Sequence, residues 1–155
     1  MPAKPTAAQR RHAALRAALD SQRTALGEPA YSGPDNPSVV LTECAAAVLR
    51  AQDAGGTPER EAVRAAVRGS LAEFARRVPG HSVEIRVPPF GAAQAVEGPR
   101  HTRGTPPGVV ETDPLTWIAL AMGYRGWQSA AADGSVSASG ERADLSPHLP
   151  LWPGA

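Results

Sequence analysis

The chain has one cysteine, few aromatic residues and no excess of either charge. Cys44 is its single cysteine in 155 residues, which excludes an internal disulfide framework and any metal site built from several cysteines. Aromatic residues make up only 5% of the chain, so alanine, valine and leucine must build the core. Lys and Arg number 16 against 15 acidic residues, and this balance does not indicate a nucleic acid or an anionic membrane as partner.

Long apolar segments are also missing from the sequence. No stretch approaches the roughly 18 consecutive apolar residues of a membrane span. The N-terminal residues MPAKPTAAQRRHAALR lack the continuous apolar run of a signal peptide. We therefore expect a cytoplasmic protein without integral membrane association, about one domain in length and long enough to bury a core.

Three helices are predicted in the first half of the chain, over residues 6–27, 36–55 and 57–79. Thr6 with Gln9 fits a capping box at the start of the first helix, and Asn36 followed by a proline caps the second. The third has the clearest helical spacing of apolar residues, which are Val63, Val67, Leu71, Phe74 and Val78.

After Gly80 the pattern changes from helical to alternating, which predicts strands mixed with short helices. The predicted strands cover residues 82–87, 91–96, 108–112 and 135–139. Short helices are predicted over 114–122, with Asp113 as the N-terminal cap, and over 127–133, followed by a final turn or helix over 141–149. Helices that precede a group of strands indicate an α+β fold.

The densest group of charged residues lies between Glu97 and Trp117, in the sequence EGPRHTRGTPPGVVETDPLTW. It combines three basic or imidazole side chains with three carboxylates: Arg100, His101 and Arg103 with Glu97, Glu111 and Asp113. Two interpretations stay open. The arginines pair with the carboxylates and stabilise an irregular loop, or their planar guanidinium groups bind an anionic ligand.

His101 is the candidate acid–base residue of this loop, because an unperturbed imidazole titrates near neutrality. No serine or cysteine nucleophile with a recognisable motif accompanies it. An enzyme or enzyme accessory that uses His101, Glu111 or Asp113 on an acidic or thiol substrate stays an alternative. We assign no catalytic residue, metal site or cofactor, and Cys44 is expected to be a buried small side chain.

The segment 114–122 is apolar around nearly all its faces as a helix. Such a helix must be covered on several sides or must border an apolar cavity. The strands that could face it are rich in small residues, which leaves two outcomes, close packing or a pocket. A different feature, the row Arg60, Arg64 and Arg68, is typical of a solvated helix face, and we do not expect nucleic-acid binding. A helical interaction protein that docks a partner through residues 1–56 also stays an alternative.

Two sequence segments carry a family resemblance. Residues 83–123, VEIRVPPFGAAQAVEGPRHTRGTPPGVVETDPLTWIALAMG, resemble the bacterial sterol-carrier-protein-like family. Residues 127–151, WQSAAADGSVSASGERADLSPHLPL, are similar to the C-terminal part of the wider sterol carrier protein 2 superfamily. There a helix, a turn of the form A-x-x-x-G and a short strand ending in glycine follow one another, here at Ala130, Gly134 and Gly140. The resemblance covers residues 60–151.

This resemblance implies a sterol carrier protein 2-like mixed sheet of about five strands, covered by helices around an apolar cavity, in a domain of residues 57–155. Residues 1–56 are then an N-terminal helical extension. The implied function is non-catalytic binding or carriage of a hydrophobic small molecule (lipid, fatty acyl or sterol-like), although similar domains also occur as non-catalytic appendages of enzymes. The sequence does not identify a protein partner. The candidate ligand-binding residues are Phe90, Trp117, Leu120, Ala121 and Trp127 around the cavity, with Arg100 and Arg103 for an anionic headgroup.

Overall fold

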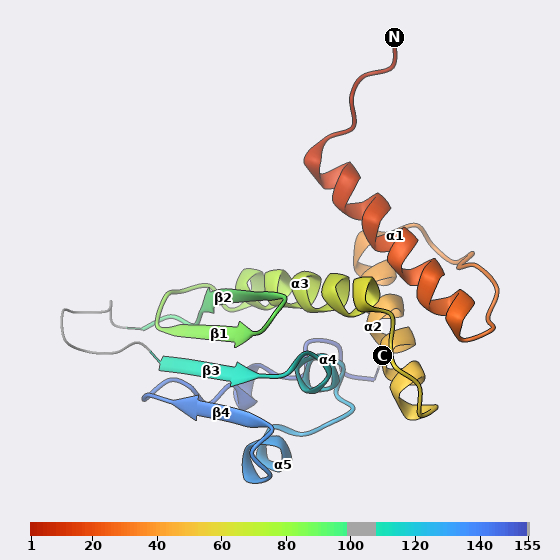
Figure 1. Ribbon diagram of the computed structural model, residues 1–155. Helices are drawn as coiled ribbons and strands as arrows, with labels where there is room; N and C mark the ends of the chain where they lie inside the picture. The colour runs from red at the N-terminus through yellow and green to blue at the C-terminus, as the bar shows by residue number, and fades with distance from the viewer. Residues whose placement is uncertain (99–107, 155) are drawn as a thin grey trace. The chain divides into compact units, whose positions relative to one another are not determined.

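The computed structural model describes residues 1–98 and 108–154 (Figure 1). The chain divides into two compact units, Met1–Ala66 and Val67–Ala155. The division falls inside α3 (Arg60–Arg77), which begins in the first unit and ends in the second. Our division of the chain into domains after residue 56 stays a prediction.

The first unit consists of α1 (Ala7–Ala25), α2 (Pro37–Asp53) and the start of α3. The predicted capping box is present, since the Thr6 side chain accepts from the Gln9 backbone and the Gln9 side chain accepts from the Thr6 backbone. The predicted cap of α2 is present too, because Asn36 Oδ1 accepts hydrogen bonds from the backbone amides of Ser38 and Val39. The predicted helix starts are thus confirmed. Helices α1 and α2 pack together.

Two carboxylates hold the loop between α1 and α2. Asp35 Oδ1 lies 2.7 Å from His12 Nε2 and 2.8 Å from an Arg16 nitrogen, and these hydrogen bonds lower the pKa of Asp35. Glu28 accepts two hydrogen bonds from Arg50, at 3.0 and 2.9 Å, which lower the pKa of its carboxyl. These charged residues therefore stabilise the loop between the helices of the first unit.

The second unit contains a four-stranded mixed sheet with the strand order β2-β1-β3-β4. The strands are β1 (Val83–Val87), β2 (Gly91–Ala95), β3 (Gly108–Thr112) and β4 (Val136–Ser139). Strand β1 pairs antiparallel with β2 and parallel with β3, and β3 pairs antiparallel with β4. The α+β class is confirmed. The expectation of about five strands is wrong for the described residues, which form the four strands that alternation predicted and no more.

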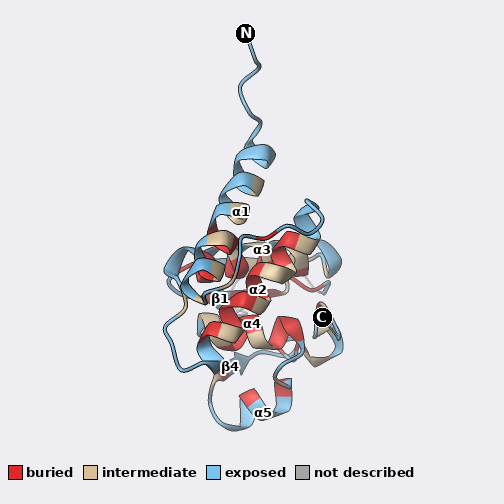
Figure 2. Ribbon diagram, turned by 90° about the vertical axis from the view of Figure 1, so that its right-hand side faces the viewer, coloured by how far each residue is buried: buried red, intermediate tan, exposed pale blue. Residues whose placement is uncertain are grey.

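Short helices complete the second unit: α4 (Pro114–Met122), α5 (Trp127–Ala132) and the 3₁₀ turn η1 (Ser146–His148). Burial alternates along β1 and β3, so one face of the sheet is buried. Figure 2 shows the buried residues of the chain in red. Across this face the register brings Ala93, Ile85, Val110 and Ala138 into one row. Ile85 and Val110 at its centre are fully buried, whereas Ala93 and Ala138 at its ends are not. The small-residue strands are therefore the edges of the sheet.

Val96 directly follows β2. Its φ of 69° is a backbone conformation that is rare for a β-branched residue. Its amide donates to the Val78 carbonyl at 2.9 Å, and its carbonyl accepts from the amide and the hydroxyl of Ser82 at 3.1 and 2.7 Å. A Cβ on Gly80, whose φ is 147°, would lie 2.1 Å from the Val96 carbonyl oxygen. This close approach of two backbone segments requires glycine at position 80.

Candidate functional site

The apolar helix α4 is held at both ends by local interactions. Asp113 Oδ2 accepts from the Thr116 amide at 3.0 Å, and Pro114 occupies the first turn. Gly123 ends the helix in the left-handed conformation, with φ 74°. The predicted cap role of Asp113 is thereby confirmed. Most of the helix is buried, namely Thr116, Trp117, Ile118, Leu120, Ala121 and Met122.

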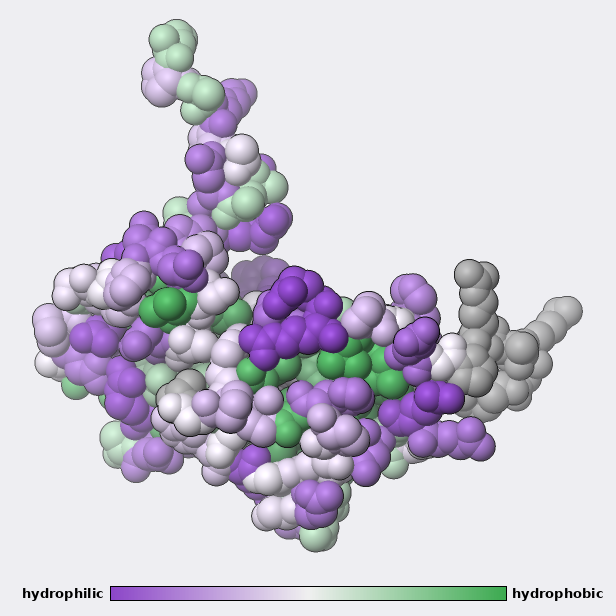
Figure 3. Space-filling model, turned by 180° about the vertical axis from the view of Figure 1, so that it is seen from behind, coloured by the Kyte–Doolittle hydropathy of each residue, from purple (hydrophilic) through white to green (hydrophobic). Residues whose placement is uncertain are grey.

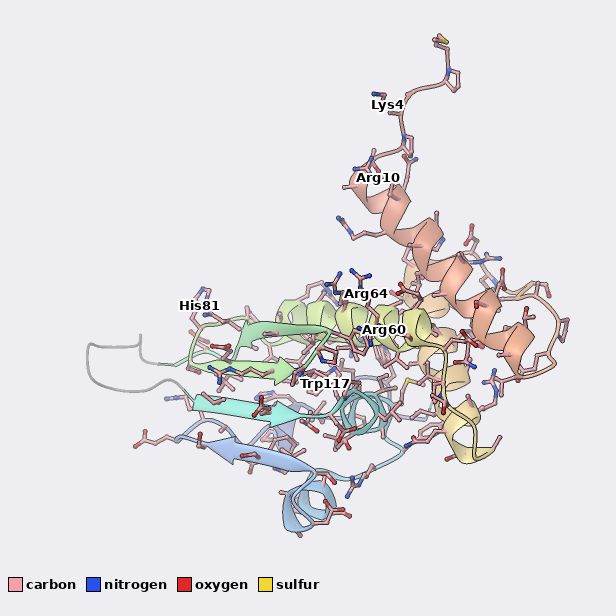
Figure 4. The ribbon with its side chains drawn as sticks, in the orientation of Figure 1. Lys4, Arg10, Arg60, Arg64, His81 and Trp117 are labelled. Atoms are coloured by element: carbon pink, nitrogen blue, oxygen red, sulfur yellow. The ribbon has the colours of Figure 1, made fainter. Side chains whose placement is uncertain are left out.

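Trp117 on α4 is the largest fully buried side chain among the described residues and is labelled in Figure 4. Its indole Nε1 donates to the Ser70 hydroxyl at 2.9 Å, which satisfies the one polar atom of the ring. Phe74 meets the Trp117 ring edge to face, with centroids 5.7 Å apart, and Phe74 meets the His148 ring in the same way at 6.1 Å. Trp117, Phe74 and His148 thus form a continuous row of rings.

The C-terminal end of α4 is covered by the end of the chain. The amides of Leu151 and Trp152 both donate to the Ala121 carbonyl, at 2.9 and 3.1 Å. A Cβ on Gly123 would contact Pro150 at 3.3 Å. The residues beneath this segment are almost inaccessible, because Leu120 and Ala121 are each 1% exposed.

The other two apolar candidates lie at opposite edges of the sheet. Phe90 belongs to the turn between β1 and β2, where its carbonyl accepts from Arg68 Nε at 2.9 Å. Trp127 begins α5, which packs next to β4. Each is 8% exposed. The structure therefore gathers Trp117, Leu120 and Ala121 on one helix and keeps Phe90 and Trp127 apart.

Arg100, His101 and Arg103 lie outside the described residues, so their suggested pairing and ligand roles stay predictions. The described flanks of their segment lie at the start of β3, where the Gly108 amide donates to the Ser82 carbonyl at 3.0 Å. Helix α4 follows the other end of β3. Five strand residues span about 16 Å, and Figure 4 accordingly shows His81 and Trp117 at opposite ends of the sheet. Neighbours in the sequence are separated here by a strand.

Two other acidic residues of the charged stretch contact arginines, one through its charge and one through its backbone. Glu111 is exposed on β3, opposite Arg86 in the register, and contributes to raising the Arg86 pKa after the larger effect of Glu84. The backbone carbonyl of Glu97 accepts from Arg142 at 3.2 Å. Within residues 1–98 and 108–154, no three side chains of the metal-binding types come together.

Sequence reasoning missed the residues that surround Trp117. Ser70 and Phe74 are one helical turn apart on α3, so they share the face that meets the indole. A buried serine among the apolar positions was the available signal. The contact of His148 with Phe74 has no local signal, because the two residues are distant in the sequence.

The buried Cys44 behaves as expected from its position on α2. It is fully buried, its sulfur donates to the Ala62 carbonyl at 3.5 Å, and burial raises the pKa of the thiol to about 12. A thiol in this environment stays protonated at neutral pH and is not a nucleophile.

A mixed sheet and a mostly buried apolar helix define an α+β protein with a hydrophobic interior in its second unit. Residues 59–151 match the family described as bacterial SCP ortholog, where SCP denotes sterol carrier protein. The match covers more than half of the chain, and the protein belongs to this bacterial sterol-carrier-protein-like family. No curated protein matches the chain. Among the described residues, no helix is both long and apolar enough to cross a bilayer.

Proposed function

We propose that the protein binds or carries a hydrophobic small molecule, such as a lipid, a fatty acyl chain or a sterol-like compound, without catalysing a reaction. Membership of the bacterial sterol-carrier-protein-like family is the observation that carries this proposal. The second unit supports it with a helix whose buried side chains are mostly apolar and carry no charged group.

The site that we assign to the ligand lies along α4. Trp117, Leu120 and Ala121 are its principal residues, because they are buried on one helix. Phe90 and Trp127 would contribute only at the edges of the sheet. Affinity would come mainly from apolar burial, at about 25 cal/mol per Å² before the costs of ordering the ligand.

The headgroup role of Arg100 and Arg103 rests on residue type alone. Both side chains lie outside the described residues. We therefore base the proposal on the apolar residues.

Figure 3 shows that apolar atoms also reach the molecular surface on the face seen from behind, to the right of its centre, where polar residues flank them. A carrier protein must take up its ligand from outside, and an apolar surface region is compatible with that step.

The direct test is mass spectrometry of organic extracts from gently purified protein, together with titration of fluorescent fatty acids. We expect a co-purified lipid or saturable binding. Recovery of no lipid together with no binding would overturn the proposal.

A pair of variants tests where the ligand binds. Ala121→Leu adds bulk to α4, whereas Ala130→Leu adds the same bulk to α5, and both positions are at most 1% exposed. We expect Ala121→Leu to weaken fatty acid binding more than Ala130→Leu at a similar loss of stability. Equal weakening by both variants would argue against a site at α4.

A further inference from the structure

The C-terminal strap, defined here as residues 148–152, begins at the last residue of the turn η1, and its residues 149–152 form neither helix nor strand. It contacts the ends of two helices of the same unit. Its Leu151 and Trp152 amides donate to the carbonyl of Ala121 on α4, and Arg77 on α3 donates to the Leu151 carbonyl. The Arg77 guanidinium also lies 5.8 Å from the centre of the Trp152 ring. A single side chain, Arg77, therefore makes two of the attachments.

The strap lies over the residues that we assign to the ligand. Ala121 and Trp117 are one helical turn apart on α4, so they share a face. His148, at the start of the strap, contacts Phe74, and Phe74 contacts Trp117. Removal of the strap would expose this row of rings and the end of α4.

A ligand cannot reach the three principal residues of α4 in the arrangement observed. Trp117, Leu120 and Ala121 are at most 1% exposed, so some segment must move before an apolar molecule contacts them. Helices and paired strands open at a larger free-energy cost than a segment held by a few partly exposed contacts. The strap is such a segment, since Leu151 is its one buried residue, Pro150 is exposed and Trp152 is only half-buried.

We propose that the C-terminal strap is the movable cover through which the apolar ligand reaches α4, and that Arg77 is the latch that holds it closed. This inference rests on the proposed function. Arg77 itself is positioned by Glu73, whose carboxylate accepts from Arg77 Nε at 2.6 Å. The same carboxylate accepts two hydrogen bonds from Arg76, at 2.9 and 2.7 Å.

Arg76 provides a matched control, because it binds Glu73 as Arg77 does but is not the residue that bonds the strap. Arg77→Ala removes the hydrogen bond to Leu151 and the contact with Trp152. Trp152→Ala removes the same ring contact from the other side and leaves the Arg77–Glu73 pair in place. If both variants change exchange and binding in the same direction, the cause is the loss of the contact with the strap. An effect of Arg77→Ala alone would point to the lost pairing with Glu73 on α3.

The first measurement is hydrogen exchange at the Leu151 and Trp152 amides of the full chain, followed by NMR. Loss of a hydrogen bond to a charged donor predicts about ten-fold faster exchange in Arg77→Ala, a smaller increase in Trp152→Ala and no change in Arg76→Ala. Unchanged exchange in Arg77→Ala would overturn the latch.

The second measurement is stopped-flow binding of a fluorescent fatty acid. We expect the association and dissociation rates to rise together, about ten-fold in Arg77→Ala, while the dissociation constant changes less than two-fold. Binding at wild-type rates in both strap variants would overturn the entrance and leave the proposed function intact. No binding to the wild-type protein would overturn the proposed function and the entrance together.

Discussion

The indole of Trp117 and the hydroxyl of Ser70 form a buried hydrogen bond of 2.9 Å between α4 and α3. Ser70 Oγ in turn donates to the Val67 carbonyl at 3.1 Å, so the hydroxyl serves as acceptor and donor at once. The bond fixes the rotation of the indole ring in the apolar interior, and with it the contact with Phe74.

Replacing Ser70 by alanine should destabilise the protein by about 1–3 kcal/mol, because the indole N–H would lose this partner in a place without water. Urea unfolding followed by tryptophan fluorescence measures the loss. Ser129→Ala, at an exposed position on α5, is the control and should stay within about 0.5 kcal/mol. A Ser70→Ala cost as small as the control would mean that the bond contributes nothing to stability.

Gly80→Ala should reduce the free energy of unfolding by about 3 kcal/mol or more, since the new Cβ would overlap the Val96 carbonyl at 2.1 Å in a backbone conformation that disfavours alanine. Gly134→Ala is the matched control. Its φ is also positive, at 82°, but nothing lies within 4 Å of the added carbon. The control should cost only about 1–2 kcal/mol, and equal losses in the two variants would rule out a role for the close approach.

Asp113→Ala should cost about 1 kcal/mol of stability, because the Thr116 amide and hydroxyl lose the carboxylate that accepts from them. Asp113→Asn should retain most of the stability, since asparagine is also a good N-terminal cap. The comparison is made by urea unfolding at neutral pH. If fatty acid binding fell in Asp113→Asn while stability did not, the carboxylate would have a role beyond the cap.

The hydrogen bonds of Glu73 within α3 should make the free energy of unfolding depend on pH in the acidic range. Hydrogen bonds from Arg76, with a further contribution from Arg77, lower the pKa of its carboxyl from 4.5 to about 2 against the opposing effect of burial. A lowered pKa stabilises the folded state above pH 4.5, and this stabilisation is lost as the pH falls from 4.5 through about 2.

The corresponding variant is Glu73→Gln, with stability measured between pH 7 and pH 2. Because Arg76 is largely exposed to solvent, we expect a loss of only about 1 kcal/mol at neutral pH, and a smaller difference from the wild type at pH 2. A difference between the two proteins that is constant over this pH range would exclude the titration of Glu73 as its cause.

The elements of the fold that sequence patterns predicted are those with local causes. The caps at Thr6, Asn36 and Asp113 depend on side chains that bond backbone groups two or three residues away, so the printed sequence contains both partners. The four strands follow from alternation or from short apolar runs between turns. Residue motifs suggested the family, and the family match over residues 59–151 confirms it. The strand count that the resemblance implied is not confirmed.

The surroundings of the candidate site could not be predicted from the sequence, because they depend on contacts between distant segments. The charged stretch runs into α4 along the chain, and β3 is part of it. The residues at the start of β3 and the helix that follows its end therefore lie at opposite ends of the sheet. The contacts of Trp117 with Ser70, and of Ala121 with Leu151, join residues that no local pattern relates.

The sequence by itself determined where the capped helices α1, α2 and α4 begin, that Cys44 is a buried small side chain, and that α4 is apolar on nearly every face. Each of these follows from the chemistry of neighbouring residues. Only the tertiary structure decided that small residues form the sheet edges, that Ser70 satisfies Trp117, and that the end of the chain covers α4. Those outcomes depend on strand order and on how distant segments share buried surface, which the packing of the whole second unit determines.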